Sequence, residues 1–269
     1  MTNNSYKLFA TDMDGTFLRP TRDYDKARLS ADLKIFAEKN LTFCAASGRQ
    51  MLALETLFAD FKNQMAFVAE NGAFVSLRGK RIFAKTLTKE QQKELIALLQ
   101  NNPYMQGDKI LLSGAKGAYV LATTADEFFE KTQIYYENVS RVASVDAIDD
   151  EIFKVTTNFE HEFTEGLEKE LNAQIPWIHA TTTGFHSIDL IPAGVDKAVG
   201  LAALADSLGL KASNVVAFGD QSNDLEMMAY AGLPIAVDNA IDAVKKLSAR
   251  VIGSNADDAV LEEIEELIK

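Results

Sequence analysis

The sequence predicts an α/β fold: a doubly wound, Rossmann-like parallel-sheet core with an inserted α+β domain. Two observations predict this arrangement. In residues 1–84 and 188–269, short β-rich runs alternate with helical patterns, as in right-handed βαβ crossovers of a parallel sheet. Residues 85–187 lack this alternation and hold strand candidates with helices between them. We therefore expect one core domain made from the two outer ranges and a second domain inserted between them.

The core elements follow from hydrophobic patterning. Predicted strands are short apolar runs, and predicted helices are amphipathic stretches long enough to cross over a sheet. The VVAF run near residue 216 has no polar alternation, which is typical of a strand covered on both faces. The strands are expected at 6–11, 41–46, 66–69, 214–219 and 233–237, and the helices at 25–40, 49–61, 196–208 and 222–231.

The inserted range has a different pattern. Its helix candidates are residues 88–100 and 124–136, and Thr88 with Gln91 three residues later forms a capping-box pattern. Its strand candidates alternate less regularly with helices than those of the core do, which favours a mixed α+β sheet. These strands are expected at 109–114, 118–123, 141–145 and 152–158.

Composition excludes several classes of protein. The 269 residues carry a formal net charge of −12, which argues against a nucleic-acid or anionic membrane partner. We find no export signal, no run of 18 apolar residues and no apolar helix stripe that predicts an obligate partner subunit. The single cysteine, Cys44, lies in an apolar run and cannot form an internal disulfide, which favours the cytoplasm.

Polar clusters follow three of the predicted core strands. They comprise residues 12–16, 47–49 and 220–224. The carboxyl ends of parallel strands form one edge of a sheet, where ligands bind in open α/β folds. We therefore expect these clusters to meet in space although two hundred residues separate them.

The acidic residues of these clusters predict a cation site. Asp12 and Asp14 are too close to stay ionised without a neighbouring cation or hydrogen bonds, and Asp220 adds a third carboxylate from another strand. Hard oxygen ligands of this kind suit Mg²⁺. An isolated pair such as Asp12 and Asp14 would more often cap a turn. Gly15 stands fourth in the run rather than sixth, which excludes an EF-hand.

Other residues of the same edge predict an anion site. Ser47 and Gly48 precede a helical pattern, so a hydroxyl and backbone N–H groups can hold an anion at the helix N-terminus. Lys197 begins another helix, where a cation needs a compensating anion. Each has a plainer interpretation, an N-cap for Ser47 and a surface cation for Lys197.

Taken together, these residues resemble the haloacid dehalogenase-like superfamily of phosphohydrolases. Residues 12–16 match its DxDGT motif, and Ser47 and Lys197 match its second and third motifs. Residues 219–224 match the fourth, GDxxND. The long insertion, with the runs at 70–73 and 188–197, is similar to that of the Cof-type, subfamily IIB, sugar phosphatases. Phe17 and Ala198 depart from the pattern outside its acting groups.

The resemblance implies a mechanism and a set of roles. Asp12 would be the nucleophile that forms an aspartyl-phosphate, and Asp14 the general acid and base. Mg²⁺ would bind the side chains of Asp12 and Asp220 and the backbone carbonyl of Asp14. The phosphoryl group would be bound by Ser47, Gly48, Lys197 and Asn223, and Asp224 would orient Lys197 or a metal-bound water.

The resemblance also implies a substrate and a role for the insertion. Residues 85–187 would be a cap that excludes water and contacts the leaving group. The expected activity is Mg²⁺-dependent hydrolysis of small phosphorylated sugars. Two alternatives are a phosphosugar mutase and a phospho-aspartate signalling switch, although a switch needs neither Asp14 nor a cap.

Overall fold

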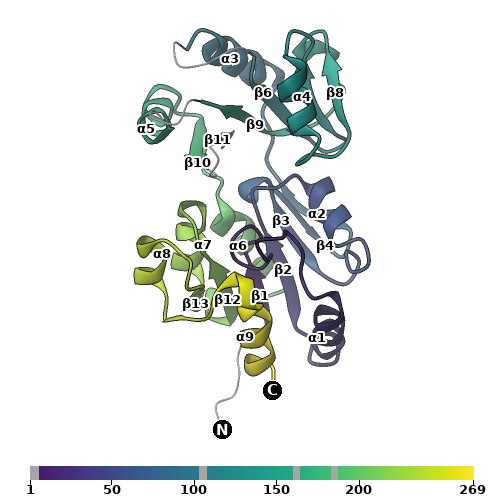
Figure 1. The fold of residues 1–269 in the computed structure, drawn as a ribbon, viewed down its shortest axis with the longest axis vertical. Coiled ribbons are helices and arrows are strands. Elements are labelled where there is room, and N and C mark those ends of the chain that lie inside the picture. The colour runs from purple at the N-terminus through teal and green to yellow at the C-terminus, as the bar shows by residue number, and fades with distance from the viewer. Residues whose placement is uncertain (1–5, 103–107, 160–163, 183–186) are drawn as a thin grey trace. The chain divides into compact units, whose positions relative to one another are not determined.

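The structure is a computed structural model that describes residues 6–102, 108–159, 164–182 and 187–269. The chain forms two compact units, which are coloured along the chain in Figure 1. The first unit consists of Met1–Ser47, Phe58–Phe83 and Asp196–Lys269, and the second of Gly48–Leu57 and Ala84–Val195. None of the described helices is long and apolar enough to cross a membrane.

An eight-stranded sheet organises the first unit. Its strand order is β14-β13-β12-β1-β2-β3-β4-β5, and the pairs from β14 to β3 are parallel. The central strands are buried along their whole length, as the unbroken apolar runs predict. The strands are β1 (Leu8–Thr11), β2 (Thr42–Ala46), β3 (Ala66–Ala69), β4 (Phe74–Leu77), β5 (Lys80–Ala84), β12 (Val215–Gly219), β13 (Leu233–Ala236) and β14 (Arg250–Val251).

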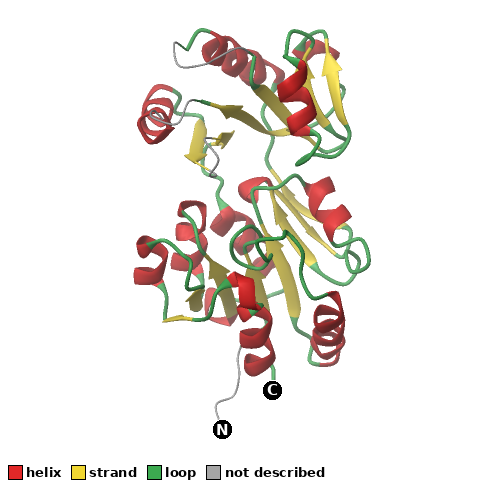
Figure 2. Ribbon diagram, viewed as in Figure 1, coloured by secondary structure: helices red, strands yellow, loops and turns green. Residues whose placement is uncertain are grey.

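Helices alternate with these strands along the chain, which confirms the predicted α/β class (Figure 2). Asp25 caps the first helix, where its carboxylate accepts from the N–H groups of Ala27 and Arg28. The lone thiol, Cys44, is buried on β2, and burial raises its pKa. The helices of this unit are α1 (Lys26–Glu38), α6 (Lys197–Ser207), α7 (Leu225–Tyr230), α8 (Asp242–Leu247) and α9 (Ala259–Leu267).

An aromatic cluster anchors the loop after β1. Phe17 is buried, and its ring centroid lies 5.4 Å from that of Phe43 and 5.6 Å from that of Tyr24. Phe58 completes the cluster, 5.0 Å from Tyr24. Rings at these separations bury large apolar areas and pack in fixed geometries. Phe17 thus fixes the end of the loop that carries residues 12–16.

A six-stranded, mostly antiparallel sheet organises the second unit. Its strand order is β10-β11-β9-β6-β7-β8, and only the β7–β8 pair is parallel. The predicted capping box is present at the start of α3, where Thr88 and Gln91 bond each other's backbone N–H groups. The strands are β6 (Ile110–Gly114), β7 (Ala118–Leu121), β8 (Val139–Val142), β9 (Ile152–Asn158), β10 (Ile178–Thr182) and β11 (Ser187–Pro192); the helices are α2 (Met51–Leu57), α3 (Lys89–Gln100), α4 (Asp126–Thr132) and α5 (Thr164–Gln174).

The two units depart from the predicted domain ranges at two places. The run from 188 is predicted to belong to the core, whereas β11 pairs antiparallel with β9 and β10 of the second unit. Its apolar pattern suits either sheet, so patterning alone could not assign it. The segment Gly48–Leu57 also groups with the second unit, where Gln50 Oε1 accepts from the Glu137 N–H at 2.8 Å.

Candidate active site

Three neighbouring parallel strands bring the acidic clusters of the first unit to one edge. Asp12 directly follows β1, and Asp220 directly follows β12, which pairs with β1 in parallel. The Asp12 N–H continues this pairing, donating to Phe218 O at 2.9 Å. Ser47 follows β2 on the other side of β1. The order β12-β1-β2 therefore explains why residues distant in sequence meet, as expected for the carboxyl edge of a parallel sheet.

A buried lysine lies between two of the carboxylates. Lys197 Nζ lies 2.6 Å from Asp12 Oδ1 and 2.7 Å from Asp224 Oδ1, and the lysine side chain is fully buried. Asp196 caps the helix that Lys197 begins, accepting from the Val199 N–H. Lys197 is therefore not a surface cation, because it has the compensating anions that a lysine at a helix N-terminus needs.

Asp224 holds the Lys197 and Asp220 segments together. While Asp224 Oδ1 accepts from Lys197, Asp224 Oδ2 accepts from the backbone N–H groups of Asp220 and Gln221 at 2.9 and 3.0 Å. Both oxygens are thus engaged by the protein. This geometry suits a carboxylate that orients its neighbours better than one that binds a ligand.

The loop after β1 also contacts Asp220. Thr16 Oγ1 donates to Asp220 Oδ1 at 2.6 Å. Gly15 has a φ of 87°, and a Cβ at this position would lie 2.5 Å from Asp220 Oδ2. Only glycine therefore fits there. The role of Thr16 is not predicted from the sequence, and its contact connects segments 204 residues apart.

The carboxylates of this edge lie close enough together to repel one another when ionised. Ligand oxygens of Asp12, Asp220 and Asp224 lie within 4.8 Å of one another, and one ammonium, that of Lys197, faces them. Burial raises the pKa of Asp12 well above its usual range, although Lys197 opposes the shift, and burial raises the pKa of Asp220 to about 6. Buried, mutually repelling carboxylates are the donor set that suits a hard divalent cation.

Lys197 remains the charged partner in this group. Burial by itself would lower the pKa of Lys197, but Asp12 and Asp224 reverse this effect and raise it above its usual value.

Two predicted residues differ from the group in exposure. Asp14 is exposed and is not a member of the carboxylate group, and Asn223 is half-buried.

Ser47 and Asn223 are joined through a residue that the sequence analysis did not assign to the site. The Ser47 carbonyl accepts from the Asn71 N–H at 3.1 Å, and Asn223 Nδ2 donates to Asn71 Oδ1 at 3.2 Å. No motif spacing in the sequence indicates these two contacts of Asn71.

Gly48 belongs to the second unit, where its carbonyl oxygen accepts from Lys154 Nζ at 2.5 Å.

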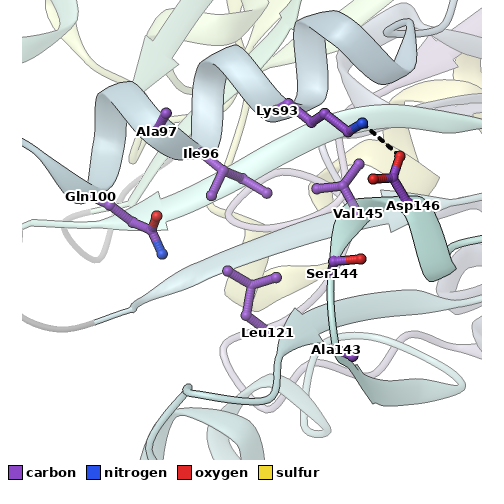
Figure 3. Close-up of a pocket in the computed structure, with 9 residues that line it drawn as sticks. All are labelled: Lys93, Ile96, Ala97, Gln100, Leu121, Ala143, Ser144, Val145 and Asp146. Carbon is purple, nitrogen blue, oxygen red and sulfur yellow. Dashed lines mark ion pairs between the residues drawn. The ribbon is translucent and has the colours of Figure 1, made fainter.

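A hollow in the second unit contains none of the predicted site residues. It has a volume of about 280 Å³, and Figure 3 shows its largely apolar lining, which includes Ile96, Leu121 and Val145. The ammonium of Lys93 at its rim is paired with Asp146 at 2.6 Å. The hollow therefore lacks the carboxylate and lysine group found at the sheet edge of the first unit.

Comparisons with known proteins give the family to which the chain belongs. Residues 9–264 match the family model described as haloacid dehalogenase-like hydrolase. The chain is 36% identical over 266 residues to the 5-amino-6-(5-phospho-D-ribitylamino)uracil phosphatase YbjI of Escherichia coli (strain K12), covering 98% of this chain and 97% of the relative. It is 27% identical over 284 residues to the phosphatase of the same name, YwtE, of Bacillus subtilis (strain 168), covering 97% and 98%.

Solved structures share the fold over nearly the whole chain. SMU.1108c from Streptococcus mutans UA159 superposes with a TM-score of 0.90 at 28% identity, covering 97% of this chain and 98% of that one. The HAD subclass IIB sugar phosphatase BT4131 superposes with a TM-score of 0.81 at 20% identity, covering 98% and 100%. By its family match and its relatives, the chain belongs to the haloacid dehalogenase-like hydrolase family, as one of its phosphatases.

Proposed function

We propose that the protein is a Mg²⁺-dependent phosphatase of small phosphorylated sugars and sugar alcohols that acts through an aspartyl-phosphate on Asp12. One observation carries the proposal. Asp12 is buried in one group with Asp220 and with the ammonium of Lys197, while Asp14, two residues later, is exposed. The two carboxylates of the loop therefore have different environments, as a nucleophile and a proton donor require.

Asp12 is the nucleophile in this proposal. Its Oδ1 is held by Lys197, and its backbone is fixed to β12 through Phe218, so the other carboxylate oxygen has a defined direction of attack. Attack on phosphorus forms the aspartyl-phosphate and breaks the bond to the substrate oxygen. Lys197 then has a second task, since its ammonium can bind a phosphoryl oxygen beside Asp12.

Asp14 is the proton donor and acceptor. It gives a proton to the leaving alcohol in the first step, and it takes one from the attacking water in the second. Its exposure lets it meet a substrate and exchange protons with solvent between steps. Ser47, Gly48 and Asn223 are proposed to bind the phosphoryl oxygens.

The residues present fit a magnesium ion. The side chains of Asp12 and Asp220, with the backbone carbonyl of Asp14, would hold it, and Thr16 and Gly15 orient and make room for the Asp220 carboxylate. When bound, the ion neutralises the charge that accumulates on the carboxylates and the phosphoryl group. Asp224, with both oxygens engaged, is proposed to position Lys197 and the backbone of Asp220.

The substrate class follows from the relatives. Those named above hydrolyse, by their names, a phosphate ester of a ribityl chain joined to an aminouracil. This compound carries a phosphorylated ribityl chain, which is a sugar-alcohol derivative and differs from the phosphorylated sugars that the family resemblance implies. We propose 5-amino-6-(5-phospho-D-ribitylamino)uracil as the first substrate to test.

Phosphate release tests the proposal. The purified protein is incubated with this compound, ribose 5-phosphate and glucose 6-phosphate, with Mg²⁺ or with excess EDTA, and Asp12→Asn serves as the control. Release with Mg²⁺ only, and none from the variant, is the expected result. Stable labelling of the protein without turnover would instead identify a signalling switch, and exchange between phosphosugar isomers would identify a mutase.

A further inference from the structure

A buried left-handed turn follows β3 in the first unit. Three successive residues, Glu70, Asn71 and Gly72, have positive φ angles of 53°, 52° and 99°, and all three are buried. A left-handed conformation carries an energetic cost for a non-glycine residue. The contacts around a turn of this kind must offset that cost.

The middle residue of the turn bonds two of the proposed phosphate-binding segments. The Asn71 N–H donates to the Ser47 carbonyl at 3.1 Å, and the Asn71 side-chain oxygen accepts from Asn223 Nδ2 at 3.2 Å. Ser47 follows β2, and Asn223 follows β12, on opposite sides of β1. Asn71 therefore connects one segment through its backbone and the other through its side chain.

The third residue of the turn packs against the segment that carries Lys197. A Cβ added to Gly72 would lie 1.9 Å from the carbonyl oxygen of Asp196 and 3.2 Å from the backbone nitrogen of Lys197. Gly200, one turn further along α6, also lies close to the turn, because its own Cβ would lie 2.9 Å from Gly72 Cα. Two glycines thus let the turn lie directly on the start of α6.

We propose that Asn71 is a positioning residue, which fixes the Ser47 and Asn223 segments relative to each other and to the N-terminus of the Lys197 helix. This inference rests on the proposed function, in which those three residues bind the phosphoryl group. Asn71 acts through Asn223, whose amide its side chain holds, and through the backbone of Ser47. Loss of the side-chain bond releases Asn223 but leaves the Ser47 bond and the turn intact.

Asn71→Gly isolates the side-chain bond. Glycine adopts a φ of 52° without strain and keeps the N–H that bonds Ser47, so only the amide is lost. We expect kcat/KM to fall about 10-fold, because the Asn223 side chain is no longer held in place. For the same reason, inorganic phosphate should inhibit and bind about 10-fold more weakly. Asn40→Gly is the matched control, since Asn40 is also left-handed, with a φ of 53°, but precedes β2 at the opposite edge of the sheet.

A double-variant cycle with Asn223→Ala separates positioning from a merely structural role. If Asn71 acts through Asn223, Asn71→Gly adds no loss of phosphate binding in the Asn223→Ala background. Additive losses would overturn the inference, as would unchanged phosphate binding in Asn71→Gly or an unfolded Asn71→Gly variant. Calorimetry with inorganic phosphate needs no turnover, so a wild-type protein that binds phosphate but releases none from any ester would count against the proposed function alone.

Discussion

Two buried lysines, one in each unit, differ in the carboxylates that they contact. Lys197 in the first unit faces Asp12 and Asp224, with Asp220 in the same carboxylate group. Lys154 on β9 of the second unit pairs with Asp189 at 3.1 Å and donates to the Gly48 carbonyl. Both ammonium groups are removed from water, where an unpaired charge would be very costly.

The difference between them distinguishes a site from a structural pair. Asp189 also accepts from Thr156 Oγ1 at 2.7 Å, and the Thr156 and Tyr136 hydroxyl oxygens lie 3.0 Å apart, so Lys154 belongs to a hydrogen-bonded network of the second unit, which we call the Lys154 network. Around Lys197, three buried carboxylates lie within 4.8 Å of one another, a donor set that suits an additional cation. We therefore expect Lys154 to support the fold and Lys197 to take part in the chemistry.

The largest expected effect comes from Asp12→Asn. It removes the proposed nucleophile, so turnover should fall at least about 10⁴-fold, as for other covalent catalysts that lose theirs. The unfolding temperature without Mg²⁺ should stay the same or rise, because one of three repelling carboxylates becomes neutral. Steady-state kinetics and thermal unfolding check both parts. Residual turnover within tenfold of wild type would exclude Asp12 as the nucleophile.

Lys154→Met should be the most destabilising change in the Lys154 network. It leaves Asp189 buried without its cation, and breaking such a pair costs about 3–5 kcal/mol in free energy of unfolding. The double variant Lys154→Met/Asp189→Leu should recover much of the loss, because no charge stays buried. Urea unfolding measures all three proteins. A loss below about 1 kcal/mol in the single variant would show that the network is not structural.

Mg²⁺ should stabilise the folded protein through the carboxylates around Lys197 and not through the residues around Lys154. At a hundredfold excess over its dissociation constant, Mg²⁺ should raise the free energy of unfolding by about 2.7 kcal/mol. The gain should disappear in Asp220→Asn and persist in Lys154→Met, if the latter folds, and EDTA should reverse it. Thermal unfolding over a Mg²⁺ titration measures this. An equal gain in Asp220→Asn would place the ion elsewhere.

The smallest expected effect concerns the buried carboxylate of Asp32. Asp32 on α1 has one oxygen with no hydrogen-bond partner among the described residues, and burial, with Glu265 nearby, raises its pKa to about 6. The folded state therefore holds this proton more tightly than the unfolded state, whose pKa is about 3.9. Stability from this group is present below about pH 4 and is lost as the pH rises to 6.

Asp32→Asn should remove this loss of stability at rising pH. The variant should gain about 1–2 kcal/mol in unfolding free energy over wild type between pH 4 and pH 7.5. Chemical denaturation at several pH values provides the measurement. A difference between the two proteins that does not change with pH would mean that Asp32 keeps its ordinary pKa.

The sequence predicted the core better than the inserted unit. Buried strands such as β2 and β12 appear within a residue or two of their predicted positions, because both their faces are covered and their runs are uniformly apolar. The half-exposed strand β8 spans Val139–Val142 rather than the predicted 141–145. An edge strand with one partner has no such uniform pattern, and its bounds depend on pairing that only the tertiary structure supplies.

For the candidate site, prediction worked where position on a strand end sufficed. Asp12, Ser47 and Asp220 could be placed together because parallel strands share a carboxyl edge. Asn71 and Lys154 could not be found in this way, because their contacts depend on a left-handed turn and on a side chain inside a sheet. No regular sequence spacing predicts either kind of contact. The catalytic and binding roles themselves remain predictions for the experiments above.

The reactivity of the Cys44 thiol can be used to measure local opening of the sheet. Its thiol is fully buried on β2, between the strands that carry the Asp12 and Asn71 segments, and no second cysteine competes for a reagent. A maleimide can react only when that part of the sheet separates, so alkylation rates measure the free energy of opening under native conditions. Comparing those rates with and without phosphate would reveal whether ligand binding tightens the sheet that presents the site.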